Sequence, residues 1–430
     1  MRPSIVRGLA TATFFVLAAC SGRDAGAPTA PGAPGAPAAA RAPTDGAGVT
    51  AFTGARLIVG DGTVIDNSTF TLGPDKHFGL VGSAAAVALP AGAAKVDLTG
   101  LTVMPAIVDT HTHLSRERDA LIADLKHRAY FGVSAALSLG QDNGTDVFAV
   151  RKEVIPGAAL YRLAGRGITA PEPGRNDIPY WVTSEGEARA AVREQAALGV
   201  DIIKIWVDDR LGKYQKLAPE IYGAAIDEAH KAGLRAIAHE YYLTDAKELL
   251  RRGIDAFAHG VRDTDVDDEF ISLLRAHPGF VLIPNLPERG VATDLSWLAT
   301  ALPPAQLEPL QTAAVDNTDA QAFFAIQARN LARVSREGIT IALGTDGNTP
   351  WGPHLEMADM VSTGMSPADV LVAATRNAAA FLKLDDAGTV APGKIGSFIV
   401  LEANPLDDIT NTRKIRDVYL RGDKVDRASY

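Results

Sequence analysis

The stretch that decides the fold is "VMPAIVDTHTH", residues 103–113, in which an apolar run ends in Asp109, His111 and His113 at alternate positions. Side chains two residues apart on a strand lie on the same face, about 6.6 Å apart. His111 and His113 can therefore both reach one metal ion at about 2.0 to 2.1 Å. Asp109 has the same parity one step deeper, where we expect a carboxylate that orients an imidazole. Taken alone, the two histidines are equally consistent with a partly exposed pair that binds nothing.

Around this stretch, one unit repeats five times: an amphipathic segment ends in a glycine, and an aliphatic residue and an apolar run follow. The runs are "FGVSAALSLG", "LGVDIIKIWV", "AGLRAIAHE", "RGIDAFAHG" and "EGITIALGTDG". The glycines fit the left-handed position that closes a helix, and the runs fit buried parallel strands. These glycines are Gly132, Gly199, Gly233, Gly253 and Gly338.

Helix-start signals support the same interpretation. Ser184 with Glu187 forms a capping box, Pro219 suits a first helical turn, and Thr244 can cap the segment that follows it. Residues 102–113 and two further candidates, "AALYRLAGRG" and "FVLIPNL", bring the strand count to eight. We predict an α/β fold, a closed (β/α)8 barrel of the TIM type over residues 105–390, with an open doubly wound sheet as the alternative.

Both flanks of this region have a different pattern. In residues 49–104, short β-type runs alternate with turn residues, and residues 391–430 repeat this style, with Gly422 and Asp423 marking a hairpin. We predict one small β-sandwich domain built from both ends of the chain.

The N-terminal segment is typical of an exported protein. Residues 1–19 combine Arg2 and Arg7 with an apolar run too short to span a membrane. The run ends in "LAAC", which resembles the lipobox of bacterial lipoproteins and predicts lipidation of Cys20; an ordinary cleaved signal with an incidental cysteine is the alternative. Residues 20–48, rich in Ala, Pro and Gly, are expected to be a flexible tether. We therefore expect a protein anchored by lipid in the bacterial cell envelope, on the periplasmic or outer-membrane face.

Composition narrows the possible partners. The formal charge of −9 over 430 residues comes without a basic stripe, so the electrostatic footprint of a nucleic-acid-binding protein is missing. A small molecule or a dipeptide is the expected partner, and a homo-oligomer is compatible with the sequence.

Residues of metal-ligand type also end other predicted strands. Lys204 lies inside "DIIKIWV", where a lysine must find a partner, such as Asp208, or lose its proton. His239 and His259 each stand six residues after their glycine, and Asp346 ends the last strand. The catalytic groups of such barrels lie at the C-terminal ends of the strands. We therefore expect these side chains to meet in one site.

These motifs, from "TGARLIVGDG" through "VMPAIVDTHTH" to "GKIGSFIVLEANPLDDI", resemble the amidohydrolase superfamily, in which a metal-dependent barrel is joined to a β-sandwich. The set H-x-H, Lys, His, His and Asp is similar to the binuclear subtype and to its imidazolonepropionase and Xaa-Pro dipeptidase-like branch. The resemblance implies two divalent metal ions, for which zinc suits the ligand types best. The ligands that it implies are His111, His113 and Asp346 for one ion, His239 and His259 for the other, and Lys204, as a carbamate, for both.

The predicted activity is hydrolysis of an amide bond in a dipeptide or an N-acyl amino acid. A hydroxide generated between the two metal ions would attack the carbonyl group, and Asp346 would pass its proton to the leaving amine. We expect Tyr241 or Tyr242 to stabilise the oxyanion, although either can simply pack against the barrel. Arg262 is expected at a substrate carboxylate, with a surface salt bridge to a neighbouring aspartate as the alternative.

Three other functions fit the same residues. An ester or lactone hydrolase would use the same metal ions. A mononuclear deaminase of the superfamily usually has a glutamate where Tyr242 stands, and it would leave Lys204 without a role. A non-catalytic lipoprotein that binds a ligand on the same barrel is the third, and the complete ligand set argues against it.

Overall fold

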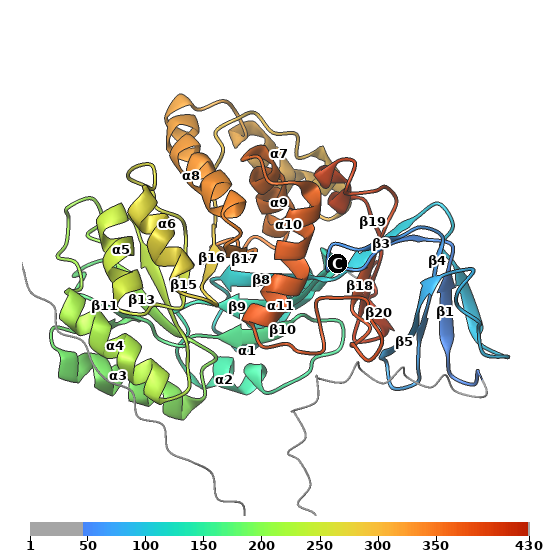
Figure 1. The fold of residues 1–430 in the computed structure, drawn as a ribbon, viewed down its shortest axis with the longest axis horizontal. Helices are drawn as coiled ribbons and strands as arrows, with labels where there is room; N and C mark the ends of the chain where they lie inside the picture. Colours follow the sequence, from blue (N-terminus) through green and yellow to red (C-terminus); the bar gives the residue numbers. More distant parts are fainter. Residues whose placement is uncertain (1–45, 429–430) are drawn as a thin grey trace, which may run out of the picture. The chain divides into compact units, whose positions relative to one another are not determined.

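The structure of this chain, a computed structural model, describes residues 46–428 (Figure 1). The predicted signal peptide, Cys20 and nearly all of the predicted tether lie outside the described residues. The described part contains a barrel of parallel strands with helices around it and a smaller assembly of antiparallel and mixed sheets.

The barrel strands follow one another in chain order. Hydrogen bonds link β8, β9 and β10 in one sheet and β13 to β17 in another. Two backbone contacts join the sheets: the Asp201 amide donates to the Leu163 carbonyl at 2.9 Å, and the Thr110 amide donates to the Leu343 carbonyl at 3.0 Å. The barrel is therefore closed, which confirms the predicted fold class. Its strands are β8 (Ile107–Thr112), β9 (Val133–Ser138), β10 (Leu160–Leu163), β13 (Ile203–Val207), β14 (Ala236–Glu240), β15 (Ala256–Ala258), β16 (Val281–Ile283) and β17 (Thr340–Ile341).

Short strands β11 (Ile168–Thr169) and β12 (Tyr180–Trp181) extend the second sheet beyond β13. The helices are α1 (Arg118–Tyr130), α2 (Thr145–Arg151), α3 (Glu185–Leu198), α4 (Pro219–Lys231), α5 (Leu243–Arg251), α6 (Asp268–Arg275), α7 (Pro304–Ala313), α8 (Thr318–Arg336), α9 (Gly352–Ser362), α10 (Pro367–Val372) and α11 (Ala378–Phe381), with shorter helical turns η1 (Ser296–Thr300), η2 (Ala373–Asn377) and η3 (Ile409–Arg413).

The local signals that start and end these helices are mostly confirmed. All five predicted helix-closing glycines have a positive φ, between 72° and 84°, a conformation that glycine adopts without steric cost. Ser184 caps α3 by accepting the Glu187 amide, and Pro219 opens α4. The prediction for Thr244 is wrong, because α5 already begins at Leu243, whose amide donates to Asp263 Oδ1 at 2.9 Å.

Both ends of the described chain build the smaller assembly, as the blue and dark red strands in Figure 1 show. One sheet has the order β5-β4-β1-β6 and the other β20-β19-β18-β7-β2-β3. Their bounds are β1 (Thr50–Thr53), β2 (Arg56–Ile58), β3 (Val64–Ile65), β4 (Ser68–Leu72), β5 (Phe78–Ser83), β6 (Ala94–Asp97), β7 (Thr102–Pro105), β18 (Phe398–Leu401), β19 (Ile415–Leu420) and β20 (Asp423–Lys424). Between the sheets lies an aromatic core that contains Phe52, Phe70, Phe78 and Phe398.

A single residue separates this assembly from the barrel. The sequence predicts one strand over residues 102–113, but the structure has two, β7 and β8, on either side of Ala106. β7 pairs antiparallel with β18, whereas β8 pairs parallel with β9. The chain thus passes directly from the sandwich sheet into the first barrel strand.

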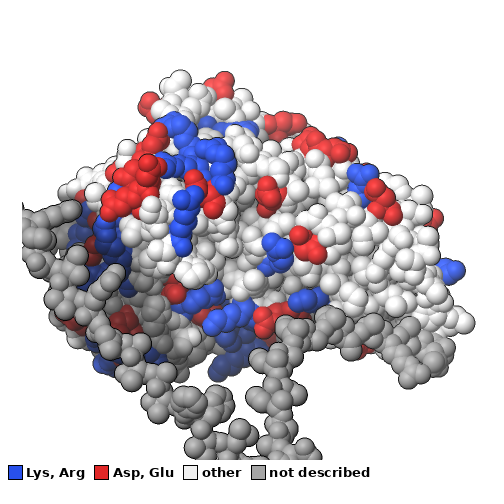
Figure 2. All heavy atoms as spheres, in the orientation of Figure 1, with Lys and Arg blue, Asp and Glu red and all other residues white. Residues whose placement is uncertain are grey.

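On the face drawn in Figure 2, acidic and basic side chains lie side by side, notably over the α5 and α6 side of the barrel. Lys247, for example, contacts Asp267 at 2.5 Å and Glu269 at 2.8 Å. Over residues 46–428, none of the helices has the length and hydropathy needed to cross a bilayer.

Replacement of Phe398 by Ala should lower the free energy of unfolding by about 3 to 5 kcal/mol, because a buried aromatic ring leaves a cavity that the sheets cannot refill. Its ring lies 4.5 Å from that of Tyr419 and 5.2 Å from that of Phe52, centroid to centroid. Urea unfolding followed by tryptophan fluorescence measures the change. Val64→Ala, in the same sheet but 40% exposed, is the control and should stay close to wild type; equal losses in both variants would contradict the assignment of this core.

Candidate metal centre

The polar side chains singled out in the sequence come together at the C-terminal ends of the barrel strands. His111 is the penultimate residue of β8, and Lys204 is the second residue of β13. His239 is the penultimate residue of β14, His259 directly follows β15, and Asp346 stands five residues after the end of β17. His113 directly follows β8. Of these six side chains, only those of His113 and Asp346 have substantial solvent exposure. Beneath them the barrel interior is apolar and includes Ile202, Ile237, Ala256 and Ile283.

One half of the site is formed by His111, His113 and Asp346. Asp346 Oδ1 lies 3.2 Å from His111 Nε2 and 3.0 Å from His113 Nε2. One ligand atom from each residue falls within 4.8 Å of the others. This spacing is suitable for three groups that share one cation.

The other half is formed by His239 and His259. Their rings lie 4.6 Å apart, and the ring of His259 lies 5.3 Å from that of His111. His259 Nε2 also approaches Asp346 Oδ2 at 3.5 Å. The two oxygens of Asp346 therefore face both halves, and the site is continuous.

Lys204 is buried at 1% exposure. Within the described residues its Nζ has no hydrogen-bond partner. The salt bridge with Asp208 that the sequence left open does not form, because Asp208 contacts Arg210 and His239 instead. Burial lowers the pKa of Lys204 to about 7, although Asp346 opposes the shift. The amine of Lys204 is thus buried, has no hydrogen-bond partner among the described residues and is protonated less readily than the amine of an exposed lysine.

The histidines are held in the form that binds metals. Burial lowers the pKa of His239 to about 3 and the pKa values of His111 and His259 well below the usual range. Their imidazoles are neutral at neutral pH, as a metal ligand must be. Burial opposes ionisation of Asp346, but the close approach of the His111 and His113 rings and the hydrogen bond from His113 outweigh burial and hold the pKa of this carboxyl below its ordinary value.

The backbone at three strand ends adopts a conformation unusual for residues other than glycine. The φ angles are 113° at His259, 42° at Asn285 and 53° at Asp346. Such conformations cost about 1 to 3 kcal/mol each and cluster at functional sites. His259 and Asp346 belong to the candidate site, and Asn285 contacts the ring of His111. The strained backbone and the candidate ligands therefore occur at the same place.

Asp109 does not orient an imidazole, and this prediction is wrong. Its Oδ2 accepts from Arg128 Nη1 at 2.9 Å and from Thr345 Oγ1 at 2.8 Å, and its Oδ1 accepts the backbone amide of His111 at 3.3 Å. Asn285 contacts the His111 ring instead, with its amide nitrogen 2.8 Å from Nδ1. Asp109 therefore supports the backbone of β8, and Asn285 fixes the ring.

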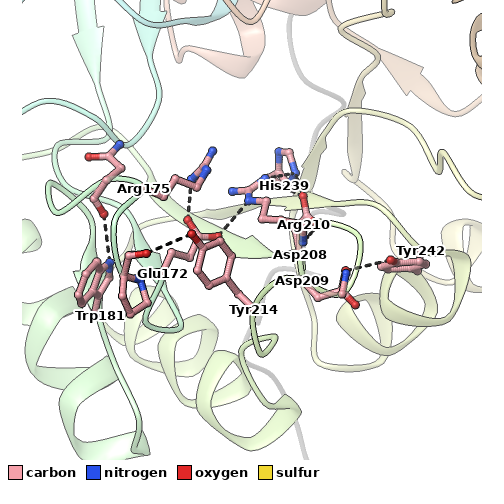
Figure 3. A network of polar contacts seen from close by, with 12 residues as sticks. Glu172, Arg175, Trp181, Asp208, Asp209, Arg210, Tyr214, His239 and Tyr242 are labelled. Atoms are coloured by element: carbon pink, nitrogen blue, oxygen red, sulfur yellow. Dashed lines mark hydrogen bonds and ion pairs between the residues drawn. The ribbon is translucent and has the colours of Figure 1, made fainter.

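A chain of charged groups supports His239 from the side of β13 (Figure 3). His239 Nε2 lies 2.9 Å from Asp208 Oδ2, and the same oxygen accepts from Arg210 Nη1 at 2.6 Å. Arg210 Nε donates to Glu172 at 2.9 Å, which also accepts from Arg175 at 2.6 Å. Because Nε2 of His239 faces the Asp208 carboxylate, Nδ1 is the ring nitrogen left for another ligand.

Tyr241 and Tyr242, the two residues expected to stabilise the oxyanion, have different neighbours. The Tyr242 hydroxyl donates to Asp209 Oδ1 at 2.9 Å, and its ring lies under Lys216. The Tyr241 ring packs against Tyr242 and Phe323.

Arg262 is partly buried. Its charge lowers the pKa values of His259, His239 and Lys204, after the larger effect of burial. The acidic neighbours that the sequence offered it are occupied elsewhere: Asp263 accepts the Leu243 amide, and Asp265 pairs with Arg329. Arg262 therefore forms neither of the surface salt bridges that the sequence offered, and its charge acts on the buried groups of the candidate site.

The sequence did not point to Asn285 or Arg210, and it raised Asp208 only as a partner for Lys204. Asp208 directly follows one predicted strand and Asn285 lies near the C-terminal end of another, so the rule used for the histidines could have found them. Arg210 has no such signal, because its place depends on a loop with positive φ at Arg210 and Leu211.

Comparison with known proteins matches the Amidohydrolase family to residues 102–425, more than half of the chain. The chain belongs to the amidohydrolase family.

Several relatives of this amidohydrolase can be compared. The uncharacterized protein Rv2915c of Mycobacterium tuberculosis is 28% identical over 207 residues, which cover 46% of this chain and 54% of that protein. The chain thus spans about half the length of this mycobacterial relative. An imidazolonepropionase of Deinococcus radiodurans is 26% identical over 353 residues, which cover 76% of this chain and 84% of that enzyme.

Solved structures are similar over most of the described amidohydrolase chain. A Bifidobacterium longum protein, provisionally described as a prolidase, has a TM-score of 0.73 and 27% identity, covering 88% of this chain and 94% of its own. A Xaa-Pro dipeptidase with bound methionine has a TM-score of 0.70 and 20% identity, covering 87% and 99%. At this identity the second likeness shows the fold alone.

Replacement of Arg128 by Met should destabilise this amidohydrolase by about 3 to 5 kcal/mol, because it leaves Asp109 as a buried, unpaired carboxylate. Both side chains of this ion pair are 0% exposed. Urea unfolding measures the loss. Arg193→Met, which removes an ion pair from a 60% exposed side chain, is the matched control and should change stability by less than about 1 kcal/mol.

The double variant Arg128→Met, Asp109→Leu removes both charges and should recover part of the loss. A single Arg128→Met variant as stable as the Arg193→Met control would show that the buried pair is not needed.

Proposed function

We propose that this chain is a metal-dependent hydrolase of carbon–nitrogen bonds and that its substrate is a dipeptide or an N-acyl amino acid. The observation that carries the proposal is the meeting of four histidines, Asp346 and a buried, unpaired Lys204 at the ends of five barrel strands. Membership of the amidohydrolase family supports the reaction class.

The residues present fit two divalent cations. Buried His111 Nε2 and both ring nitrogens of His259 have no hydrogen-bond partner among residues 46–428, as is the case for Lys204 Nζ. Imidazoles combined with carboxylate-type oxygens suit zinc. In this proposal His111, His113 and Asp346 would hold one ion, and His239 and His259 would hold the other. The neutral amine of Lys204 would add carbon dioxide and release a proton, and the resulting carbamate would supply oxygen ligands.

The contacts around His239 support its place in this set. Its Nε2 faces Asp208, and partners of this kind fix the tautomer and raise the basicity of a ligating imidazole. Asp208 is itself held by Arg210. The network in Figure 3 therefore acts as a positioning device for His239 in this proposal.

Divalent cations, when bound, lower the pKa of a water molecule and polarise a carbonyl group. Asp346, with one oxygen facing His111 and His113 and the other facing His259, is placed to accept a proton from the attacking water. It then delivers that proton to the leaving amine. Tyr241 takes the oxyanion role in preference to Tyr242, whose hydroxyl is engaged by Asp209.

Arg262 supplies the contact for a free substrate carboxylate. It lies close enough to Lys204, His239 and His259 to shift their pKa values, and its Nε is buried without a hydrogen-bond partner in the described part of the chain. A guanidinium matches the two oxygens of a carboxylate. Dipeptides and N-acyl amino acids both carry such a group next to the scissile amide.

Replacement of Lys204 by Ala should remove the bridging ligand, reduce bound metal to below two ions per chain and abolish hydrolysis. Metal analysis and turnover of a library of dipeptides, N-acyl amino acids, esters and lactones measure these effects. Lys231→Ala, at an exposed lysine of α4 with an ion pair to Asp227, is the control and should keep both properties.

Full turnover and two ions per chain in the Lys204 variant would refute the bridging role. Cleavage of esters or lactones alone would favour the related hydrolase class, and one ion per wild-type chain with release of ammonia would favour a deaminase. A metal-loaded wild type without activity on the whole library would favour a non-catalytic ligand-binding protein.

Replacement of Arg262 by Gln should raise KM for N-acyl amino acids by about 10-fold or more, because a hydrogen bond to a charged group contributes about 1.5 to 3 kcal/mol. Analogues whose carboxylate is capped as an amide should show a much smaller change. Steady-state kinetics with both substrate series measures the difference. Arg329→Gln, at an exposed arginine paired with Asp265, is the control. An equal loss on both series in the Arg262 variant would contradict carboxylate binding.

A further inference from the structure

A cavity of about 410 Å³ opens beside the candidate metal centre. Thr345, Asp346 and Gly347 line one end of it. From there it continues between the segment that follows β16, helices α7 and α9, and Arg413 at the end of η3. Neither Arg262 nor Lys204 lines it, so this cavity is separate from the contacts proposed for the substrate carboxylate.

The walls of the cavity are mainly apolar. Leu286, Val291, Leu295, Leu310 and Leu355 contribute to them. Such walls suit the methylene groups of a side chain. They leave the choice of substrate to the few charged groups that the cavity contains.

Two arginines occupy the cavity at Asp359. Arg289 Nε lies 3.6 Å from Asp359 Oδ1. Arg413 lies with its guanidinium carbon 5.0 Å from the centre of the Trp297 ring. Both Nε atoms are buried and have no hydrogen-bond partner within residues 46–428. Burial raises the pKa of Asp359 to about 6, although both arginines oppose the shift. Within the lining, Asp359 is thus the carboxylate that both guanidinium groups face, and the charges of Asp408 and Asp294 act on Arg413 from outside it.

Glu356 does not balance the second arginine. Its side chain is buried at 5% exposure, and both of its oxygens accept the Leu286 amide, at 3.1 and 3.2 Å. Burial raises its pKa well above the ordinary value, and the nearby charges of Asp359 and Asp346 add to the shift. The remaining acidic group in the lining, Glu288, is exposed.

The cavity has charged groups at two places. Asp346 lines it at the candidate metal centre, and Asp359 lines it beside Arg289. The cavity therefore borders both the expected place of the scissile amide and the arginines.

We propose that this cavity binds the side chain of the acyl residue of the substrate and selects a carboxylate at its end, as in a glutamyl residue. This inference rests on the proposed hydrolase function. An anion would supply the donors of Arg289 and Arg413 with the acceptor that they lack. A cationic side chain would meet two guanidinium groups at the same place and be repelled.

The test compares dipeptides Glu–X, Gln–X and Lys–X, with X the leaving residue that the wild-type enzyme accepts best. The wild type should hydrolyse Glu–X with a kcat/KM at least about 10-fold above that for Gln–X, and Lys–X should be the poorest. In Arg289→Met and Arg413→Met the Glu/Gln ratio should fall towards one. Arg289→Lys keeps the charge and should retain part of the preference, and Arg193→Met, on the surface of α3, should keep all of it.

Equal hydrolysis of Glu–X and Gln–X by the wild type, or preference for Lys–X, would overturn this inference and leave the hydrolase function intact. If no amide is cleaved, the proposed function fails, and the selectivity of the cavity for a carboxylate is then tested by ligand binding. Calorimetry of the metal-loaded protein with glutarate and with its monoamide should then show at least about 10-fold tighter binding of glutarate, with the difference lost in Arg289→Met. Equal binding of the two probes would overturn the inference.

Discussion

The site depends on the hydrogen bonds that close the barrel between its first and last strands. The His111 carbonyl accepts the amides of Thr345 and Asp346, at 3.0 and 2.8 Å. Through these two bonds Asp346, in the loop after β17, is held beside the C-terminal end of β8. Asp346 therefore meets His111 and His113 because of backbone pairing, before any metal contributes. The positive φ of Asp346 is sustained by the same bonds, since a residue in a strained conformation needs surroundings that fix it.

Closure also explains the electrostatics of the centre. Once the strands form a barrel, the ends of β13, β14 and β15 face the same interior as β8. Lys204, His239 and His259 are thereby removed from water, and removal from water favours their neutral forms. A single fact of topology thus keeps these lysine and histidine side chains in the neutral forms that can bind a cation.

Much of the barrel and of the candidate metal centre could be predicted from the sequence, because the sequence contains a repeated unit. A glycine, an apolar run and a polar end recur along the chain, six residues from glycine to histidine at His239 and His259 and eight from glycine to aspartate at Asp346. The places of these three residues therefore follow from local pattern alone. Asp109 shows the limit of this reasoning. Its parity is right, but its partner Arg128 comes from α1, and no spacing rule states which helix residue faces a given strand. The cavity at Arg289 and Arg413 was also beyond reach, because its walls come from segments far apart in the chain that meet only in the folded protein.

The one-residue passage from β7 to β8 at Ala106 has a consequence for register. β7 is fixed between β18 and β2 in the sandwich sheet, so the position of every residue in β8 along the barrel axis is set from outside the barrel. Because side chains alternate along a strand, a slip of one residue at β7 would turn His111 and His113 away from the interior. The sandwich sheet contributes none of the candidate ligands, but its pairing with β7 fixes the register of β8 and so determines which side chains of β8 point into the barrel.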